Sequence, residues 1–136
     1  MELRICMDVN DLERAIAFYT EGLGLQLGRR FGNDFVELLG TACPIDLLFN
    51  AAGTHPVPGS GSPRNYQRHW TPLHLDFVVD DIDAAVARLQ QLGAVLEMPV
   101  TDKAWGRIAG LADPFGHGLD LLQFQGRGYD AILQPN

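Results

Sequence analysis

The feature that most constrains this chain is an internal repeat. The segment Val9-Asn10-Asp11-Leu12 recurs 70 residues later as Val79-Asp80-Asp81-Ile82. Farther along, Ile45-Asp46-Leu47-Leu48 recurs as Leu119-Asp120-Leu121-Leu122, at an offset of 74 residues. Self-similarity at a nearly fixed spacing is the signature of a duplicated supersecondary unit. The chain is therefore predicted to contain two tandem copies of one module.

Each copy is predicted to begin with a strand and a helix. Residues Leu3 to Val9 alternate between apolar and polar types, which indicates a strand with one side facing a core. Asn10 or Asp11 then caps a helix, with Glu13 placed three residues after Asn10 as in a capping box. Apolar residues at helical spacing continue to Leu23, where glycines end the helix. The second copy repeats this plan from residue 73 onward.

The remaining segments predict three more strands in the first copy, at 25–31, 35–39 and 45–49, separated by turn residues. The segment from residue 51 to 70 is rich in proline, glycine and serine and is predicted to be an exposed linker. We therefore expect an α+β fold with two tandem βαβββ modules forming a cupped mixed sheet. A single domain, 1–136, is expected to comprise module 1 (1–50), the linker (51–70), module 2 (71–127) and a C-terminal tail (128–136).

Composition limits the classes of partner. The 136 residues, 46% of them hydrophobic, suffice for one domain with a real core. A net charge of -7 with only 10 Lys and Arg argues against nucleic acid as a partner, because phosphate binding needs clustered cations. The sequence shows neither a signal peptide nor an apolar run of membrane-spanning length. Two cysteines without metal-ligand spacing fit a reducing cytoplasm. A small molecule is the expected ligand.

The repeat also pairs polar residues on equivalent strands. Arg4 corresponds to His74, and Asp46 corresponds to Asp120. Because successive strand side chains point to opposite faces, these four are expected on the concave side, away from the helices. The predicted site is thus a cleft that both copies line. By the same alternation, Cys6, Asp76 and Phe124 face that side, and Trp105 lies in a loop at its rim. These four residues and Arg4 are predicted to contact a ligand.

Several sequence motifs of this chain resemble those of a known family. The pattern Val-x-Asp-Leu-x-x-x-x-x-Phe-Tyr over Val9 to Tyr19, the Gly22-Leu23-Gly24-Leu25 sequence, the strand from His74 to Asp81 and the turn Asp113-Pro114-Phe115-Gly116 are similar to the vicinal oxygen chelate superfamily. That superfamily includes glyoxalase I, extradiol dioxygenases, fosfomycin resistance enzymes and bleomycin-binding proteins. The resemblance covers Leu3 to Phe124 and implies paired βαβββ modules.

The resemblance also implies a metal site, and this sequence departs from it at one position. In metal-dependent members the first and last strands of each module supply His or Gln, Glu, His and Glu. Those places fall here at Arg4, Asp46, His74 and Asp120. Only His74 matches outright, the two aspartates are one methylene shorter than Glu, and Arg4 has donors only and cannot ligate. A site made of His74, Asp46 and Asp120 is therefore one hypothesis.

Three functional interpretations remain open from the sequence. In the first, a divalent metal such as Mn, Fe, Co, Ni or Zn supports lyase, isomerase or dioxygenase chemistry. In the second, Arg4 pairs with Asp46 or Asp120 and the chain is a metal-free small-molecule binding protein of the resistance type. In the third, the chain is a non-catalytic interaction module. The resemblance further implies a homodimer, since the cup is often completed across one.

Overall fold

The structure is a computed structural model that describes residues 1–135, so Asn136 of the predicted tail lies outside the described residues. The chain divides into two compact units, Met1–Gln67 and Arg68–Asn136, each with one four-stranded sheet. The first contains β1 (Ile5–Val9), α1 (Leu12–Leu23), β2 (Gln26–Phe31), β3 (Phe35–Leu39) and β4 (Ile45–Phe49). The second contains β5 (Leu75–Val78), α2 (Ile82–Gln91), β6 (Val95–Lys103), β7 (Gly106–Ala112), β8 (Gly118–Phe124) and the short 3-10 helix η1 (Gly128–Ile132).

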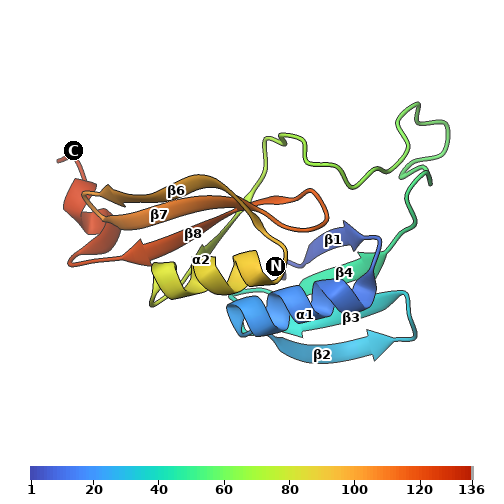
Figure 1. The fold of residues 1–136 in the computed structure, drawn as a ribbon, viewed down its shortest axis with the longest axis horizontal. Helices are drawn as coiled ribbons and strands as arrows, with labels where there is room; N and C mark the ends of the chain where they lie inside the picture. The colour runs from blue at the N-terminus through green and yellow to red at the C-terminus, as the bar shows by residue number, and fades with distance from the viewer. Residues whose placement is uncertain (136) are drawn as a thin grey trace. The chain divides into compact units, whose positions relative to one another are not determined.

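The two sheets have the same topology, which confirms the predicted α+β class and the duplication. Their strand orders are β1-β4-β3-β2 and β5-β8-β7-β6. In each, the first and last strands of the module pair in parallel and the other neighbours are antiparallel. One helix covers one face of each sheet (Figure 1). We call the opposite face the open face of that sheet.

Each core lies between a sheet and its own helix. In the first unit the fully buried apolar residues include Val9, Phe18, Tyr19, Val36, Leu38 and Leu47. In the second they include Ile82, Leu89, Ala109, Leu111 and Leu121. Within each strand these residues occupy alternate positions, as the period of a strand requires, and Glu37, Asp46 and Asp120 are among the residues between them. The helix therefore decides which side chains of each strand are left for the open face.

Two of the predicted core residues are not in the core. Leu3 and Leu73 were expected to pack under the helices, but their side chains are exposed, at 65% and 75%. Each precedes the paired part of its strand, because β1 starts at Ile5 opposite Ile45 and β5 starts at Leu75 opposite Leu119. Outside the ladder, alternation no longer fixes the direction of a side chain.

The helices are capped by aspartates, with one correction to the expected residue. Asp11 is the N-cap of α1 and its carboxylate accepts a hydrogen bond from the Arg14 amide. The predicted capping box between Asn10 and Glu13 is therefore wrong. The N-cap lies one residue later, at Asp11, and the residue three positions after it is an arginine. Gly24 ends α1 at φ 74°, the left-handed conformation that glycine adopts without a steric penalty.

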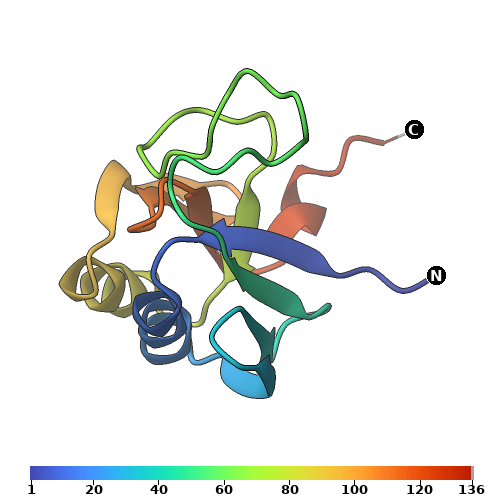
Figure 2. The same cartoon turned by 90° about the vertical axis from the view of Figure 1, so that its right-hand side faces the viewer.

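The segment after β4 returns to the first sheet. The sequence predicts a linker over 51–70, and the contacts of the chain divide within that range, between Gln67 and Arg68. Arg64 Nε donates to Asp8 Oδ2 at 2.7 Å, and the Tyr66 hydroxyl donates to the Asn50 carbonyl at 2.6 Å. This segment, seen as the green arch in Figure 2, has no helix or strand of its own. Side-chain bonds to the ends of β1 and β4 hold it in place.

A buried carboxylate shapes the turn between β7 and β8. Asp113 Oδ1 accepts hydrogen bonds from the Phe115 and His117 amides, both at 2.9 Å, and Oδ2 lies 2.8 Å from His117 Nδ1. The Asp-Pro-Phe-Gly sequence is thus a structural turn, and His117 is part of it.

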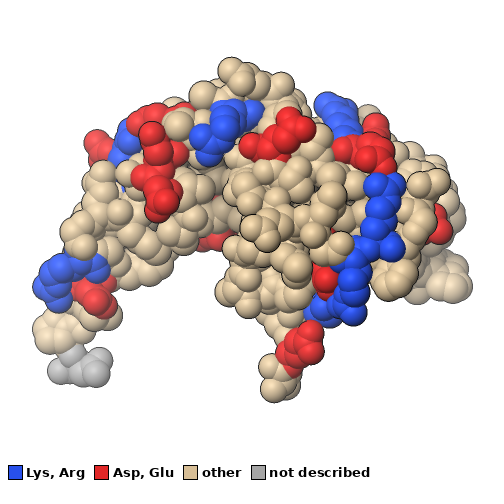
Figure 3. Space-filling view, turned by 90° about the horizontal axis from the view of Figure 1, so that it is seen from below, with Lys and Arg blue, Asp and Glu red and all other residues tan. Residues whose placement is uncertain are grey.

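On the face shown in Figure 3, basic side chains lie beside acidic ones. Within residues 1–135, no helix is long and apolar enough to cross a membrane.

Removing the cap of α2 is expected to destabilise the fold. Asp81 accepts from the Ala84 amide at 3.0 Å, so Asp81→Ala should lower the free energy of unfolding by about 1 kcal/mol. Asp80→Ala, at the neighbouring carboxylate that is not the cap, is the matched control and should change it by only a few tenths. Urea denaturation followed by circular dichroism measures both. Equal losses in the two variants would contradict the assignment of the cap.

Candidate functional site

The open face of the first sheet carries a closed ionic network. Strand register sets Asp46 of β4 between Cys6 of β1 and Glu37 of β3. Arg4, just before β1, donates from Nε to Asp46 Oδ2 at 2.8 Å and from Nη2 to Asp46 Oδ1 at 2.6 Å. The same Nη2 lies 2.5 Å from Glu37 Oε2. One guanidinium therefore engages both oxygens of one carboxylate and one oxygen of another.

A second arginine completes this network. Arg29 of β2 donates to Glu37 Oε1 at 3.1 Å and to Oε2 at 2.6 Å. Gly28 makes room, because a Cβ at that position would lie 2.7 Å from Glu37 Oε1. The hydrogen bonds that Arg29 and Arg4 donate lower the pKa of Glu37 to about 2, and those that Arg4 donates to Asp46 and Glu37 raise the pKa of Arg4. Two carboxylates and two guanidinium groups thus neutralise one another.

Glu37 and Arg29 are members of this network that the sequence interpretation missed. Glu37 is the lone charge in Phe-Val-Glu-Leu-Leu, and the alternation applied to β1 places it on the open face as well. Strand alternation in the sequence could therefore have predicted the position of Glu37. The partner, Arg29, follows from the antiparallel β2–β3 pairing, which has an irregular register between Leu27 and Arg30 and which no sequence pattern indicates.

The second sheet brings three different groups together at the equivalent place. Asp76 of β5 and Asp120 of β8 are register partners. His74 Nε2 lies 3.2 Å from Asp76 Oδ1 and 3.5 Å from Asp120 Oδ2. Burial and the neighbouring Asp76 carboxylate raise the pKa of Asp120, while His74 opposes this effect. We call His74, Asp76 and Asp120 the His-Asp-Asp cluster.

The two sheets differ at one antiparallel neighbour. Glu37 stands opposite Asp46 in β3 and β4, whereas Gly110 stands opposite Asp120 in β7 and β8. A Cβ at Gly110 would come within 3.2 Å of Asp120 Oδ1. The second sheet therefore has no second carboxylate opposite its aspartate, and Met98 packs close to the glycine that stands there.

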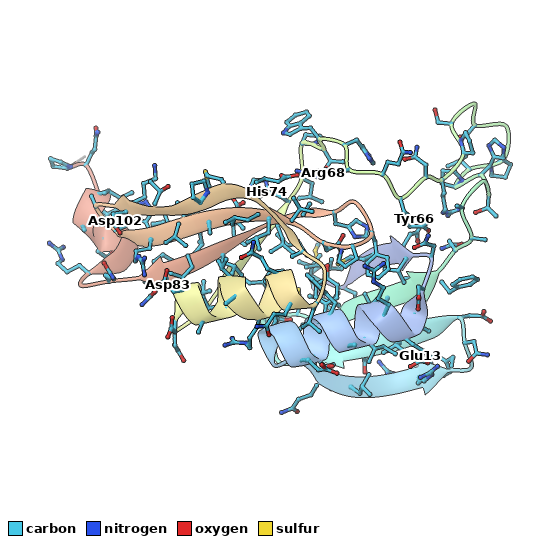
Figure 4. All side chains as sticks on the ribbon, viewed as in Figure 1. Glu13, Tyr66, Arg68, His74, Asp83 and Asp102 are labelled. Carbon is cyan, nitrogen blue, oxygen red and sulfur yellow. The ribbon has the colours of Figure 1, made fainter. Side chains whose placement is uncertain are left out.

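A pocket of about 180 Å³ opens beside this cluster within the second unit. It is lined by Arg68, Trp70, Thr71, His74, Glu97, Leu111, Gly118, Leu119 and Asp120. Arg68 Nε donates to Glu97 Oε1 at 2.7 Å, and Gly118 leaves room for its guanidinium, since a Cβ there would lie 2.6 Å from Nη2. Figure 4 shows Arg68 and His74 close to each other. Trp70 is 80% exposed.

The remaining predicted ligand contacts lie on both units. Cys6 Sγ lies 3.9 Å from Asp46 Oδ2 in the first. Trp105 and Phe124 lie in the second, with ring centroids 5.8 Å apart. Tyr129 of η1 joins them, 5.1 Å from Trp105 and 4.7 Å from Phe124, and was not expected because η1 lies in the predicted tail.

The donor sets of the two units differ in their fitness for a metal ion. Asp46 is predicted as a metal ligand, but both its carboxylate oxygens accept hydrogen bonds from Arg4. In this arrangement neither oxygen is free to bind a metal ion. In the second unit, one donor atom each from His74, Asp76 and Asp120 lie within 4.8 Å of one another, the only such group among residues 1–135. A nitrogen with two carboxylates suits Mn, Fe or Zn. The second unit alone fits such an ion.

Comparison with known proteins places the fold. A family model described as a glyoxalase-like domain matches residues 4–122. A structure titled as a glyoxalase-related enzyme from Fulvimarina pelagi superposes with a TM-score of 0.71 at 19% identity, covering 90% of this chain and 87% of the other. The chain therefore belongs to the glyoxalase-like domain family, within the vicinal oxygen chelate superfamily that its sequence resembles.

Two relatives extend the comparison. An uncharacterised protein of Mycobacterium bovis is 33% identical over 120 residues, which cover 85% of this chain and 78% of that protein. The anthracycline biosynthesis protein DauV of Streptomyces sp. (strain C5) is 31% identical over 121 residues, again 85% of this chain but 38% of that protein. The present chain thus matches only part of the length of DauV.

The ionic network is expected to make stability depend on pH through Glu37. Its pKa is lowered from 4.5 to about 2, so its ionised form stabilises the folded state above pH 4.5, and this contribution is lost as the pH falls through about 2. Wild type should therefore exceed Glu37→Gln in stability at pH 7, and the difference should shrink between pH 4.5 and 2. Urea denaturation at several pH values measures it.

Glu21→Gln is the matched control for this pH series, because Glu21 is exposed on α1. It should follow the wild-type curve. A constant difference between wild type and Glu37→Gln down to pH 2 would show that the pKa of Glu37 is not coupled to folding.

Proposed function

We propose that this protein binds a small molecule without a metal ion, with the Arg4 guanidinium serving as the internal cation of the first unit. The observation that carries the proposal is the two-point contact of Arg4 with Asp46. A buried carboxylate needs a positive partner. Arg4 satisfies Asp46 and Glu37 together, so no metal ion is required to neutralise them.

The second unit is the proposed ligand-binding half. Its pocket contains an exposed indole, a histidine and two carboxylates, the mixed lining that small-ligand sites use. The cavity of about 180 Å³ is smaller than most drug-sized sites, which suits one end of a ligand whose remainder lies over the sheet. A small-molecule role also agrees with the name of the Streptomyces relative DauV, which refers to anthracycline biosynthesis.

The His-Asp-Asp cluster favours a second candidate, a metal-dependent enzyme of this family. His74, Asp76 and Asp120 would hold the ion, which when bound would polarise an oxygen of the substrate. Gly110 places no charged side chain opposite Asp120 that would compete for it. Arg68, already paired with Glu97, would form part of the pocket wall.

Metal analysis separates the two candidates. Wild type purified without chelator should contain far less than one equivalent of Mn, Fe, Co, Ni or Zn. Arg4→Gln removes the cation that Asp46 and Glu37 share, so Mn²⁺ or Zn²⁺ should raise the melting temperature of this variant more than that of wild type. Elemental analysis and thermal shift provide the measurements.

Arg4→Lys is the matched control, because it keeps a positive charge near Asp46 and should resemble wild type in its metal response. One equivalent of metal in wild type that disappears in His74→Ala would overturn the metal-free proposal and support the enzyme. Identical metal responses of Arg4→Gln and Arg4→Lys would show that the guanidinium does not replace a metal ion.

A further inference from the structure

The open face of the second sheet has a polar end and an aromatic end. Gln123 Oε1 accepts from the Ile82 amide at the start of α2, so Gln123 faces the helix. Asp120, Leu122 and Phe124 alternate with it and point to the open face, since β8 keeps a regular register with β7 over its whole length. Leu122, between the carboxylate and the exposed phenyl ring, is only 3% exposed, so the accessible path from one end to the other runs over its neighbour Val78 on β5.

Three rings from different segments gather at the aromatic end. Trp105 comes from the turn between β6 and β7, Phe124 from the end of β8 and Tyr129 from η1, with edge-to-face contacts of 4.7 to 5.8 Å between centroids. Phe124 is 40% and Tyr129 49% exposed. Val78 of β5, which is 60% exposed and pairs with Leu122, continues the apolar surface toward Asp76. The rings remain accessible although they contact one another.

The polar end carries negative charge that no arginine or lysine neutralises. Among the described residues, Asp76 and Asp120 form ion pairs only with His74. The one nearby guanidinium in the pocket, Arg68, is held by Glu97 through two hydrogen bonds. This contrasts with the first sheet, where Asp46 and Glu37 are paired with Arg4 and Arg29. The duplicated position is neutralised in one unit and left anionic in the other.

We propose that this face binds an amphiphilic aromatic amine, with its ammonium group against Asp76 and Asp120 and its ring against Trp105, Phe124 and Tyr129. Charge complementarity selects the ammonium, and stacking on exposed rings selects the aromatic part. Four residues of strand separate Asp120 from Phe124, about 13 Å at 3.3 Å per residue, which sets the length of the ligand. This inference rests on the proposed function and names its ligand class.

A divalent metal is the competing occupant of the polar end. Three protein donors there could hold one, but an ion would leave the aromatic end uncovered. An amine with an aromatic tail covers both ends at once. The two occupants also differ in how they respond to loss of the rings, since only the amine would lose affinity.

A shape-matched series tests the ligand class. The probes are 6-phenylhexylamine, 6-phenylhexan-1-ol and 6-phenylhexanoate, which share the ring and chain and differ in the charge of the head group. We expect the amine to bind at least 10-fold more tightly than the carboxylate, with the alcohol between them. Amide chemical shifts in ¹⁵N spectra should change on β5, β8 and η1. Titration by these spectra or by calorimetry gives the affinities.

Variants assign the two ends. The double variant Asp76→Asn/Asp120→Asn should reduce the preference for the amine over the alcohol to less than about 2-fold. Asp80→Asn, which removes one charge at the start of α2, is the control and should leave the preference unchanged. Phe124→Ala should weaken the amine and the alcohol by similar factors. Circular dichroism confirms that each variant is folded before titration.

The outcomes separate this inference from the proposed function. Equal affinity for amine and carboxylate, or an unchanged preference in the double aspartate variant, would overturn the amine assignment. The proposed function would still stand in that case if the protein contained no metal. Stoichiometric Mn²⁺ or Zn²⁺ that blocks the amine and depends on His74 would overturn both. An amine preference in metal-free protein that the aspartate substitutions abolish would support both.

Discussion

Parallel pairing of the first and last strands of each module is the constraint on which the rest of the structure depends. It sets Cys6 beside Asp46 in one unit and Asp76 beside Asp120 in the other. Because the helix covers the face that Leu47 and Leu121 occupy, the aspartates that directly precede these leucines must point to the open face. A carboxylate is therefore built into the same place in both units, and each unit must supply something positive or leave that charge for a ligand.

The two units solve this electrostatic problem differently. The first surrounds Asp46 with Arg4 and Glu37 and adds Arg29, so that its charges cancel within hydrogen-bonding distance. Such a network costs less than isolated buried charges, because each group is paired. The second has His74 and a glycine in place of the arginine and the glutamate, so its charge is only partly compensated. Duplication followed by divergence at these positions has made one unit internally complete and left the other open to a cation.

The surroundings of the open unit extend this asymmetry. Arg68 is the nearby guanidinium in the pocket, but Glu97 holds it with both oxygens. Phe124 and Trp105 stand at the far end of the same face with Tyr129, a residue outside both repeated modules. The two ends of this face are thus anionic and aromatic, with the exposed Val78 of β5 between them. The segment tied down by Asp8 and Arg64 serves the first unit in a different way, by closing the ends of β1 and β4.

The sequence by itself determined the duplication, the α+β class and the strand face on which Asp46 and Asp120 lie, because strand periodicity and repeat spacing are local properties. Arg4 and His74 precede the paired parts of β1 and β5, so periodicity alone did not place their side chains. The sequence also indicated the departure at Arg4. Only the tertiary structure decided which partner each charge has. Glu37, Arg29 and Gly110 lie on strands that pair through antiparallel neighbours far apart in the chain, and Tyr129 reaches its cluster from beyond the repeat. Such partners depend on register between strands and on the space that a missing Cβ leaves, neither of which a single sequence encodes locally.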